Sequence, residues 1–384
     1  MKITLPIADG GAESYELQGV GLPASQDPVT FNRIAFAAAH VVADARSASE
    51  PGGQPAIDWE CTLAYRRYLL GLGFNIAEAM DTSQRGMGLD WHSAFELITR
   101  SLADAGAGRG RIFSGVGTDH LAAADARSCD DVVKAYGQQF SAVEKLDGRC
   151  IMMASRALAR VARSPADYIK VYSRVLADVQ QPVILHWLGD MFDPALGGYW
   201  GSDDFETTMA TCLEMIDANS GKIDGIKISL LDEQKEVIMR RRLPSSVKMY
   251  TGDDFNYPSL IAGDEQGHSH ALLGIFDAIA PAASQALGAI AAGDTQKYER
   301  IFGPTVPLSR LIFRAPTQNY KTGIVFLAWL NGHQDHFIMI NGAQSARPLP
   351  YFTEIFKLAD QANLLRDPDM AVARMQQLLA VYGV

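Results

Sequence analysis

The sequence predicts an α/β protein built on a closed (β/α)8 TIM barrel, with a short extension before the barrel and a helical region after it. Short apolar runs alternate with amphipathic stretches along most of the chain, and this order is typical of parallel strands joined by helices. Eight such strands can be counted in the sequence. Eight is also the number at which a parallel sheet closes into a barrel.

The chain of 384 residues divides into three expected parts. Residues 1–30 are rich in Gly, Pro, Ser and Asp, contain one strand-like run at 2–5, and form the extension. Residues 31–293 carry the eight β/α units of the barrel. Residues 294–384 read as helices punctuated by Gly and Pro, so we expect a helical C-terminal region packed on the barrel.

The first expected strand is an apolar run that a Gly- and Pro-containing linker separates from a helix with Asp58 as its N-cap. The expected strands are 33–42, 74–80, 111–114, 149–154, 182–187, 225–229, 246–251 and 267–272. The expected helices are 58–70, 91–105, 121–136, 165–179, 204–217, 231–241, 257–262 and 277–292.

Composition excludes several classes of protein. With 48% apolar and 20% charged residues, the chain is globular and long enough for a large core. A net charge of -10 argues against binding to nucleic acid or to an anionic membrane surface. The four cysteines lack metal-type spacing and are expected to be reduced. No signal peptide or membrane span is visible, so we expect a soluble, cytoplasmic protein.

One short strand carries the strongest chemical signal. In DGIKIS, residues 224–229, alternation places Ile226 and Ile228 on one face and Lys227 on the other. If helices cover the isoleucines, Lys227 faces the barrel interior, where an ammonium group is costly unless it is paired or reactive. Lys227 is therefore a candidate amine nucleophile. A structural ion pair is the alternative that the local sequence leaves open.

Other candidate residues fall at the carboxyl ends of strands, where barrel enzymes keep their reactive groups. His186 in PVILHW, residues 182–187, would share the interior with Lys227 and could relay protons. Thr82 and Ser83 offer two hydroxyls for a small carboxylate. The alternative for His186 is a core histidine that is hydrogen-bonded to a neighbouring backbone group. The alternative for Thr82 and Ser83 is a turn or helix N-cap.

Several motifs together resemble the dihydrodipicolinate synthase and N-acetylneuraminate lyase superfamily of class I, Schiff-base-forming aldolases. GIK at 225–227 resembles the lysine strand of that family, TGDD at 251–254 resembles its next strand, and PVILHW resembles PVILYN. SGVGTD at 114–119 is similar to the glycine motif of the third strand, and ARPLP at 346–350 resembles a C-terminal RPPL. The resemblance runs from about residue 33 nearly to the end of the chain.

The resemblance implies that Lys227 forms an imine with a 2-oxo acid, either pyruvate-like or derived from a sugar, and that a carbon–carbon bond is made or broken. It implies that Thr82 and Ser83 hold the carboxylate, that no metal or organic cofactor is needed, and that the protein forms a homo-oligomer, a dimer or tetramer. His186 stands where the family has a tyrosine, and DTSQR at 81–85 stands where the family has GTTGE. The fourth strand ends in ASRALARV, so a tyrosine relay from a neighbouring subunit is not visible.

We expect Asp253, His268 and His270 to line the mouth of the barrel and to set specificity. Two other functions stay open at this stage. A metal-dependent hydrolase or aldolase would use imidazoles and carboxylates that converge on a divalent ion. Its candidate ligands are His120, His186, His268, His270, Asp119 and Asp253. A noncatalytic binding protein on the same barrel is the third possibility.

Overall fold

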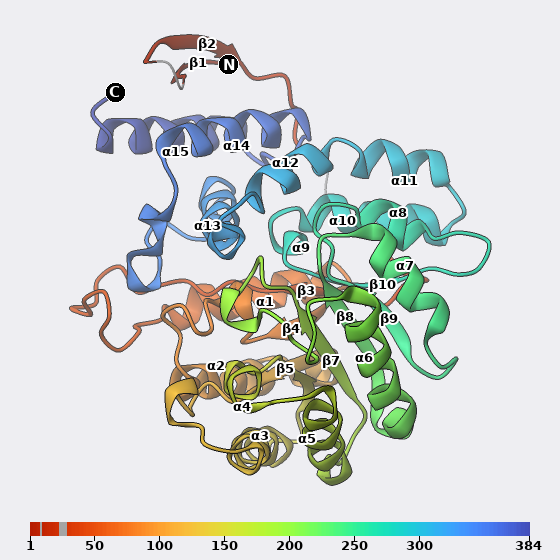
Figure 1. Cartoon of the computed structure of the whole chain (residues 1–384). Helices are drawn as coiled ribbons and strands as arrows, with labels where there is room; N and C mark the ends of the chain where they lie inside the picture. Colours follow the sequence, from red (N-terminus) through yellow and green to blue (C-terminus); the bar gives the residue numbers. More distant parts are fainter. Residues whose placement is uncertain (8–9, 23–28) are drawn as a thin grey trace.

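Eight parallel strands close into a barrel in the computed structural model, which describes residues 1–7, 10–22 and 29–384 (Figure 1). The strands are β3 (Ala35–Ala38), β4 (Asn75–Glu78), β5 (Ile112–Val116), β6 (Arg149–Met152), β7 (Val183–Leu188), β8 (Ile223–Ser229), β9 (Lys248–Thr251) and β10 (His270–Leu273). Each strand pairs with its neighbours along the sequence, and β10 closes the barrel against β3. The predicted fold class is confirmed.

Helices surround the barrel and connect its strands (Figure 1). They are α1 (Trp59–Gly71), α2 (Trp91–Asp104), α3 (Cys129–Glu144), α4 (Arg156–Val161), α5 (Pro165–Asp178), α6 (Phe205–Asn219), α7 (Glu233–Arg242), α8 (Tyr257–Ala262), α9 (Ile275–Ala278) and α10 (Ala280–Ala291). Asp58 caps α1 as predicted, because its carboxylate accepts a hydrogen bond from the amide of Cys61.

Two predicted helices differ from the structure in where they begin or end. The helix expected at 121–136 begins only at Cys129, because Ser128 and Asp131 form a capping box that fixes the start of α3. The helix expected at 277–292 is divided into α9 and α10. Asp277 therefore lies inside the short α9 and is buried, where sequence alone placed it as the first residue of a long helix.

The barrel strands separate two apolar regions. An inner cluster fills the lumen, and its members come mainly from the strands. The members are Phe36, Ala38, Ala77, Met80, Phe113, Ile151, Ile184, Tyr250 and Leu272. Ile226 and Ile228 belong to the larger outer core between the strands and the helices. Because side chains alternate along a strand, Lys227 points into the lumen, as the sequence predicted.

The C-terminal region is helical, as predicted, and covers one side of the barrel (Figure 1). It contains α11 (Thr295–Phe302), α12 (Thr305–Ile312), α13 (Tyr320–Leu330), α14 (Leu349–Gln361) and α15 (Pro368–Val381). Every residue of α13 is buried, which fits the apolar run from Ile324 to Leu330 in its sequence. No helix in the described ranges is long and apolar enough to cross a membrane.

The N-terminal extension forms a two-stranded antiparallel hairpin of β1 (Lys2–Pro6) and β2 (Ala12–Glu16). The strand-like run at 2–5 is confirmed, and the second strand was not predicted. The hairpin packs on α14: the hydroxyl of Tyr15 donates to Asp360 over 2.8 Å, and Lys357 pairs with Glu13 over 2.9 Å. Figure 1 shows the hairpin on the far side of the C-terminal helices from the barrel.

Candidate active site

Lys227 is the fifth residue of β8 and points into the lumen near the carboxyl end of the barrel. Its side chain is enclosed, with the residue only 8% exposed. Burial lowers the pKa of Lys227, and the nearby carboxylates of Asp254 and Asp81 oppose this shift. Within the described part of the chain, no group accepts a hydrogen bond from its ammonium nitrogen. A larger fraction of the amine is therefore uncharged, and nucleophilic, than in a free lysine.

His186 is the direct neighbour of Lys227 on β7, where the two Cα positions are paired. Its Nε2 lies 3.1 Å from the hydroxyl of Ser229, whereas its buried Nδ1 has no hydrogen-bond partner among the described residues. Burial, and then the charge of Lys227, hold the pKa of His186 well below its usual range. The imidazole is therefore neutral near pH 7, and its Nδ1 is free to form a hydrogen bond with a bound molecule.

The TGDD motif supplies a carboxylate beside the lysine, and that carboxylate is Asp254. It accepts a hydrogen bond from the amide of Ile275 over 2.9 Å, and burial raises the pKa of Asp254 to about 7. Asp253 is also buried, but its carboxylate accepts hydrogen bonds from the amides of Phe255 and Asn256. Asp253 therefore shapes the turn after β9 and does not line the mouth as the sequence analysis expected.

The glycine of TGDD leaves room for the lysine side chain. A Cβ atom at Gly252 would lie 2.7 Å from Cε of Lys227 and 2.3 Å from the hydroxyl oxygen of Ser229. Real Cβ atoms do not approach other atoms this closely, so either of these side chains would have to move. The backbone carbonyl of Ile228 is also close, at 2.6 Å, so Gly252 is required by the close approach of the end of β8, which includes Lys227.

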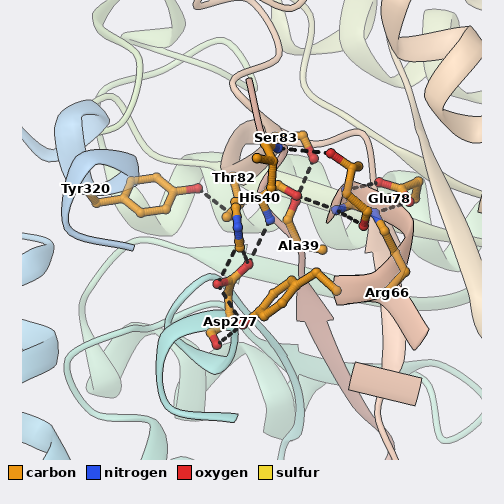
Figure 2. A network of polar contacts seen from close by, with 11 residues as sticks. Ala39, His40, Arg66, Glu78, Thr82, Ser83, Asp277 and Tyr320 are labelled. Atoms are coloured by element: carbon orange, nitrogen blue, oxygen red, sulfur yellow. Dashed lines mark hydrogen bonds and ion pairs between the residues drawn. The ribbon is translucent and has the colours of Figure 1, made fainter. Parts of the chain in front are cut away.

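Thr82 and Ser83 lie in a short 3₁₀ turn (Asp81–Ser83) that follows β4, and both are buried. The hydroxyl of Ser83 donates to the carbonyl of Ala39 over 2.6 Å, and its amide donates to the carbonyl of Met80. Ser83 therefore braces the turn against the end of β3. Thr82 is different, because its Oγ1 lies 2.8 Å from the hydroxyl of Tyr320 on α13 (Figure 2).

A buried polar network holds the ends of β3 and β4 in place (Figure 2). The side chain of Arg66 forms an ion pair with Glu78 over 2.8 Å and also donates to the carbonyl of His40. The imidazole of His40 in turn lies 2.8 Å from a carboxylate oxygen of Asp277. Sequence reasoning missed this network because its partners are far apart in the chain. The one available signal was a histidine at the end of the first predicted strand.

A cavity of about 660 Å³ opens beside these residues. Asp81 and His186, the neighbours of the lysine, are among its lining residues, while Lys227, Thr82 and Ser83 are not. Two arginines also line it, and each is paired: Arg85 with Asp119 over 2.7 Å, and Arg156 with Asp193 over 2.5 Å. Arg85 is the residue that stands at the end of DTSQR. Its Nη1 donates to the backbone carbonyls of Ala79 and Gly115, and its Nε and Nη2 donate to Asp119.

His268 and His270 lie at the opposite, amino-terminal end of the barrel. His270 is the first residue of β10, and its Nδ1 accepts a hydrogen bond from the amide of Ile34, which precedes β3. Its charged neighbours are Lys248, Arg33 and Asp224, and Lys248 and Asp224 stand near the starts of their strands. The expectation that both histidines line the mouth was therefore wrong, because they enter the barrel at the beginning of a strand.

The residues proposed as metal ligands do not converge. His120 is exposed and pairs with Gln138, His186 is in the lumen, and His268 and His270 are at the amino-terminal end. Over residues 1–7, 10–22 and 29–384, no three His, Cys, Asp or Glu side chains gather in a way that could hold a metal ion. The geometry therefore gives no support to the metal-dependent alternative.

Solved structures with the same fold come from dihydrodipicolinate synthases. A protein from Pseudomonas aeruginosa described as a dihydrodipicolinate synthetase has a TM-score of 0.64 and 17% sequence identity, covering 86% of this chain and 99% of its own. The enzyme from Aquifex aeolicus has a TM-score of 0.63 and 13% identity, covering 87% and 99%. That from Acinetobacter baumannii, solved with pyruvate, has a TM-score of 0.63 and 16% identity, covering 86% and 99%.

The molecule is thus a (β/α)8-barrel protein with the architecture of the dihydrodipicolinate synthases and a buried lysine near the carboxyl end of the barrel. The resemblance expected from the motifs is confirmed at the level of the fold. The chain belongs to the family described as a protein of unknown function (DUF993), whose model matches residues 3–384. No curated protein matches the chain in sequence.

Proposed function

We propose that this protein is a lyase of the class I aldolase type, in which Lys227 forms a Schiff base with a small 2-oxo acid. The observation that carries the proposal is the state of Lys227: an enclosed lysine with a lowered pKa, without a hydrogen-bonded partner, beside a cavity at the carboxyl end of the barrel. Desolvation of a lysine is one of the ways in which proteins activate an amine nucleophile. The fold likeness to a synthase solved with pyruvate supports the same substrate class.

The chemistry follows from the positions of the neighbouring groups. The neutral amine of Lys227 adds to the C2 carbonyl of the 2-oxo acid, and loss of one water molecule leaves an imine. Protons must move to and from the oxygen during these steps, and this role is assigned to the imidazole of His186 and the carboxyl of Asp254, which both lie beside the lysine. The imine then acts as the electron sink when a carbon–carbon bond is made or broken.

The substrate carboxylate is assigned to the turn that contains Thr82. The hydroxyl of Ser83 is already engaged with Ala39, so Ser83 contributes by fixing the turn and Thr82 provides the hydroxyl. Asp81 and His186 connect this turn and the lysine to the cavity, which has space for the rest of the substrate. The proposal includes a homo-oligomer, a dimer or tetramer, only by analogy with the dihydrodipicolinate synthase and N-acetylneuraminate lyase superfamily.

The proposal is tested by reductive trapping with borohydride in the presence of a panel of 2-oxo acids, measured by intact mass and then by peptide mapping. We expect one adduct, on the peptide that contains Lys227. Lys321 is the internal comparison, because it is also buried and burial lowers the pKa of Lys321 to about 8. An adduct on Lys321 alone, or no adduct with any 2-oxo acid, would overturn the assignment.

A further inference from the structure

Tyr320 is a residue of the C-terminal region that reaches the candidate active site. It is the first residue of α13, and Figure 2 shows its side chain directed toward Thr82 on the turn after β4. Its hydroxyl oxygen lies 2.8 Å from Oγ1 of Thr82, although the two residues are 238 positions apart in the sequence. No motif in the sequence pointed to this residue.

The ring of Tyr320 is held firmly in this position. It stacks on Phe313 with ring centroids 4.3 Å apart and an angle of 15° between the planes, and it meets Phe192 edge-on. Gly274, which follows β10, allows the ring to approach, because a Cβ atom there would lie 3.2 Å from Cε2 of Tyr320. The ring is therefore held by segments that follow β7 and β10, and its hydroxyl meets the turn that follows β4.

Tyr320 and Lys227 share their acidic surroundings. Asp81 and Asp254 are the two carboxylates that act on the charge of Lys227, and both also act on Tyr320, together with Asp277. These two carboxylates follow β4 and β9, so both Tyr320 and Lys227 are close enough to the acidic groups at these strand ends to be influenced by their charge. Burial and these carboxylates raise the pKa of Tyr320 well above its usual range, so its hydroxyl stays protonated.

We propose that Tyr320 is a positioning residue of the active site, which donates its hydroxyl hydrogen to Thr82 and thereby leaves the hydroxyl hydrogen of Thr82 free to bind the carboxylate of the 2-oxo acid. A threonine hydroxyl has one hydrogen to donate and also accepts. When a protonated tyrosine occupies the acceptor side, the threonine acts as a donor toward an anion. This inference rests on the proposed function, and it makes the C-terminal region part of the site.

The test uses the full-length protein and measures trapping of Lys227 as a function of pyruvate concentration, which separates the half-saturating concentration from the maximal trapping rate. For Tyr320→Phe we expect the half-saturating concentration to rise roughly fivefold, the change expected from one lost hydrogen bond of about 1 kcal/mol. The maximal rate should change less than about twofold, because the groups around Lys227 are unaltered. Thr82→Val should raise the half-saturating concentration at least as much.

The double variant provides the decisive comparison. If Tyr320 acts through Thr82, Tyr320→Phe combined with Thr82→Val should behave like Thr82→Val alone. Tyr298→Phe is the matched control, since Tyr298 is buried in the same C-terminal region and donates to the carbonyl of Pro258, away from the site. It should lower thermal stability to a similar extent and leave the half-saturating concentration unchanged.

Three results of the trapping measurement would contradict the positioning role of Tyr320. An unchanged or lower half-saturating concentration in Tyr320→Phe, with normal trapping in the wild type, would overturn the positioning role and leave the proposed function intact. A fall in maximal rate at constant half-saturation would overturn it as well, in favour of a direct proton-transfer role. If the wild-type protein is not trapped by any 2-oxo acid, both the proposed function and this inference are wrong.

Discussion

The two ends of the barrel carry the same types of side chain and differ in how these are paired. At the amino-terminal end, Lys248 forms an ion pair with Asp224 over 2.8 Å, and the hydroxyl of Tyr250 donates to the same carboxylate over 2.7 Å. At the carboxyl end, neither the ammonium of Lys227 nor Nδ1 of His186 has a hydrogen-bond partner among the described residues. A single strand, β8, contributes Asp224 to one end and Lys227 to the other.

This difference separates structural charges from reactive ones. A buried charge that is paired and hydrogen-bonded offsets part of its own desolvation cost, so it can serve the fold alone. A buried amine without a partner remains costly, and such groups concentrate where chemistry needs a shifted pKa. We therefore expect changes at the carboxyl end of this barrel to alter imine formation and changes at the amino-terminal end to alter stability alone.

The largest difference is expected between the two lysines. Lys227→Met should abolish reductive trapping, whereas Lys248→Met should leave the trapping rate of Lys227 unchanged. Loss of the partly buried Lys248–Asp224 pair should cost about 1 kcal/mol of folding stability. Trapping by intact mass and thermal unfolding of both variants provide the measurements. Equal loss of trapping in both variants would show that the amino-terminal end is not merely structural.

Two glycines allow the same comparison without changing any charge. Gly252→Ala should reduce trapping more than tenfold, because the new Cβ would clash with the end of β8 and displace Lys227 and Ser229, and Gly225→Ala should leave trapping intact. At Gly225 the Cβ would lie 2.5 Å from the ring of Tyr250, so both variants should lose roughly 1–3 kcal/mol of stability. Gly137→Ala, with no atom within 4 Å of the new Cβ, is the neutral control.

Asp254 should control the pH dependence of imine formation. Its carboxylate opposes the lowering of the pKa of Lys227, so Asp254→Asn should lower the pKa of Lys227 further. Because trapping needs the uncharged amine, the pH midpoint of trapping should fall. Burial raises the pKa of Asp254 to about 7, so its charge is lost below that pH. The variant should therefore differ from the wild type above pH 7 and approach it at lower pH.

Asp224→Asn at the amino-terminal end is the control for this pH profile. Asp224 interacts with Lys248 and Tyr250 and is not a neighbour of Lys227. The midpoint of trapping should therefore remain at the wild-type value in this variant. An upward shift in Asp254→Asn, or equal shifts in both variants, would contradict the assignment of Asp254 as the charged neighbour of the lysine.

The sequence was sufficient to predict the barrel and the inward direction of Lys227, because alternation along a strand and the order of β/α units are local patterns. It was insufficient for His268 and His270. β10 has only four residues and begins at His270, so deciding which end of so short a strand a side chain occupies requires the strand boundaries. Tyr320 and Asp277 were missed because each meets its partner across more than 230 residues.

The last prediction concerns stability alone, at a buried acid with one carboxylate oxygen that has no hydrogen-bond partner in the described part of the chain. Glu236 on α7 accepts a hydrogen bond from Ser269, which precedes β10, while its second carboxylate oxygen has no partner in the described ranges. Burial raises the pKa of Glu236 from 4.5 to about 8. Between these two pH values the folded protein holds a proton that the unfolded chain releases, so stability should fall as the pH rises through that window.

Glu236→Gln should remove this pH-dependent loss. The variant should gain about 1–3 kcal/mol relative to the wild type at pH 8.5, and little or nothing at pH 5, where the wild-type side chain is already protonated in the folded state. Chemical unfolding at the two pH values measures the difference. Glu206→Gln, at an exposed ion pair with Arg242, should change stability by less than about 0.5 kcal/mol at either pH. A gain that is equal at both pH values would show that Glu236 is ionised in the folded protein.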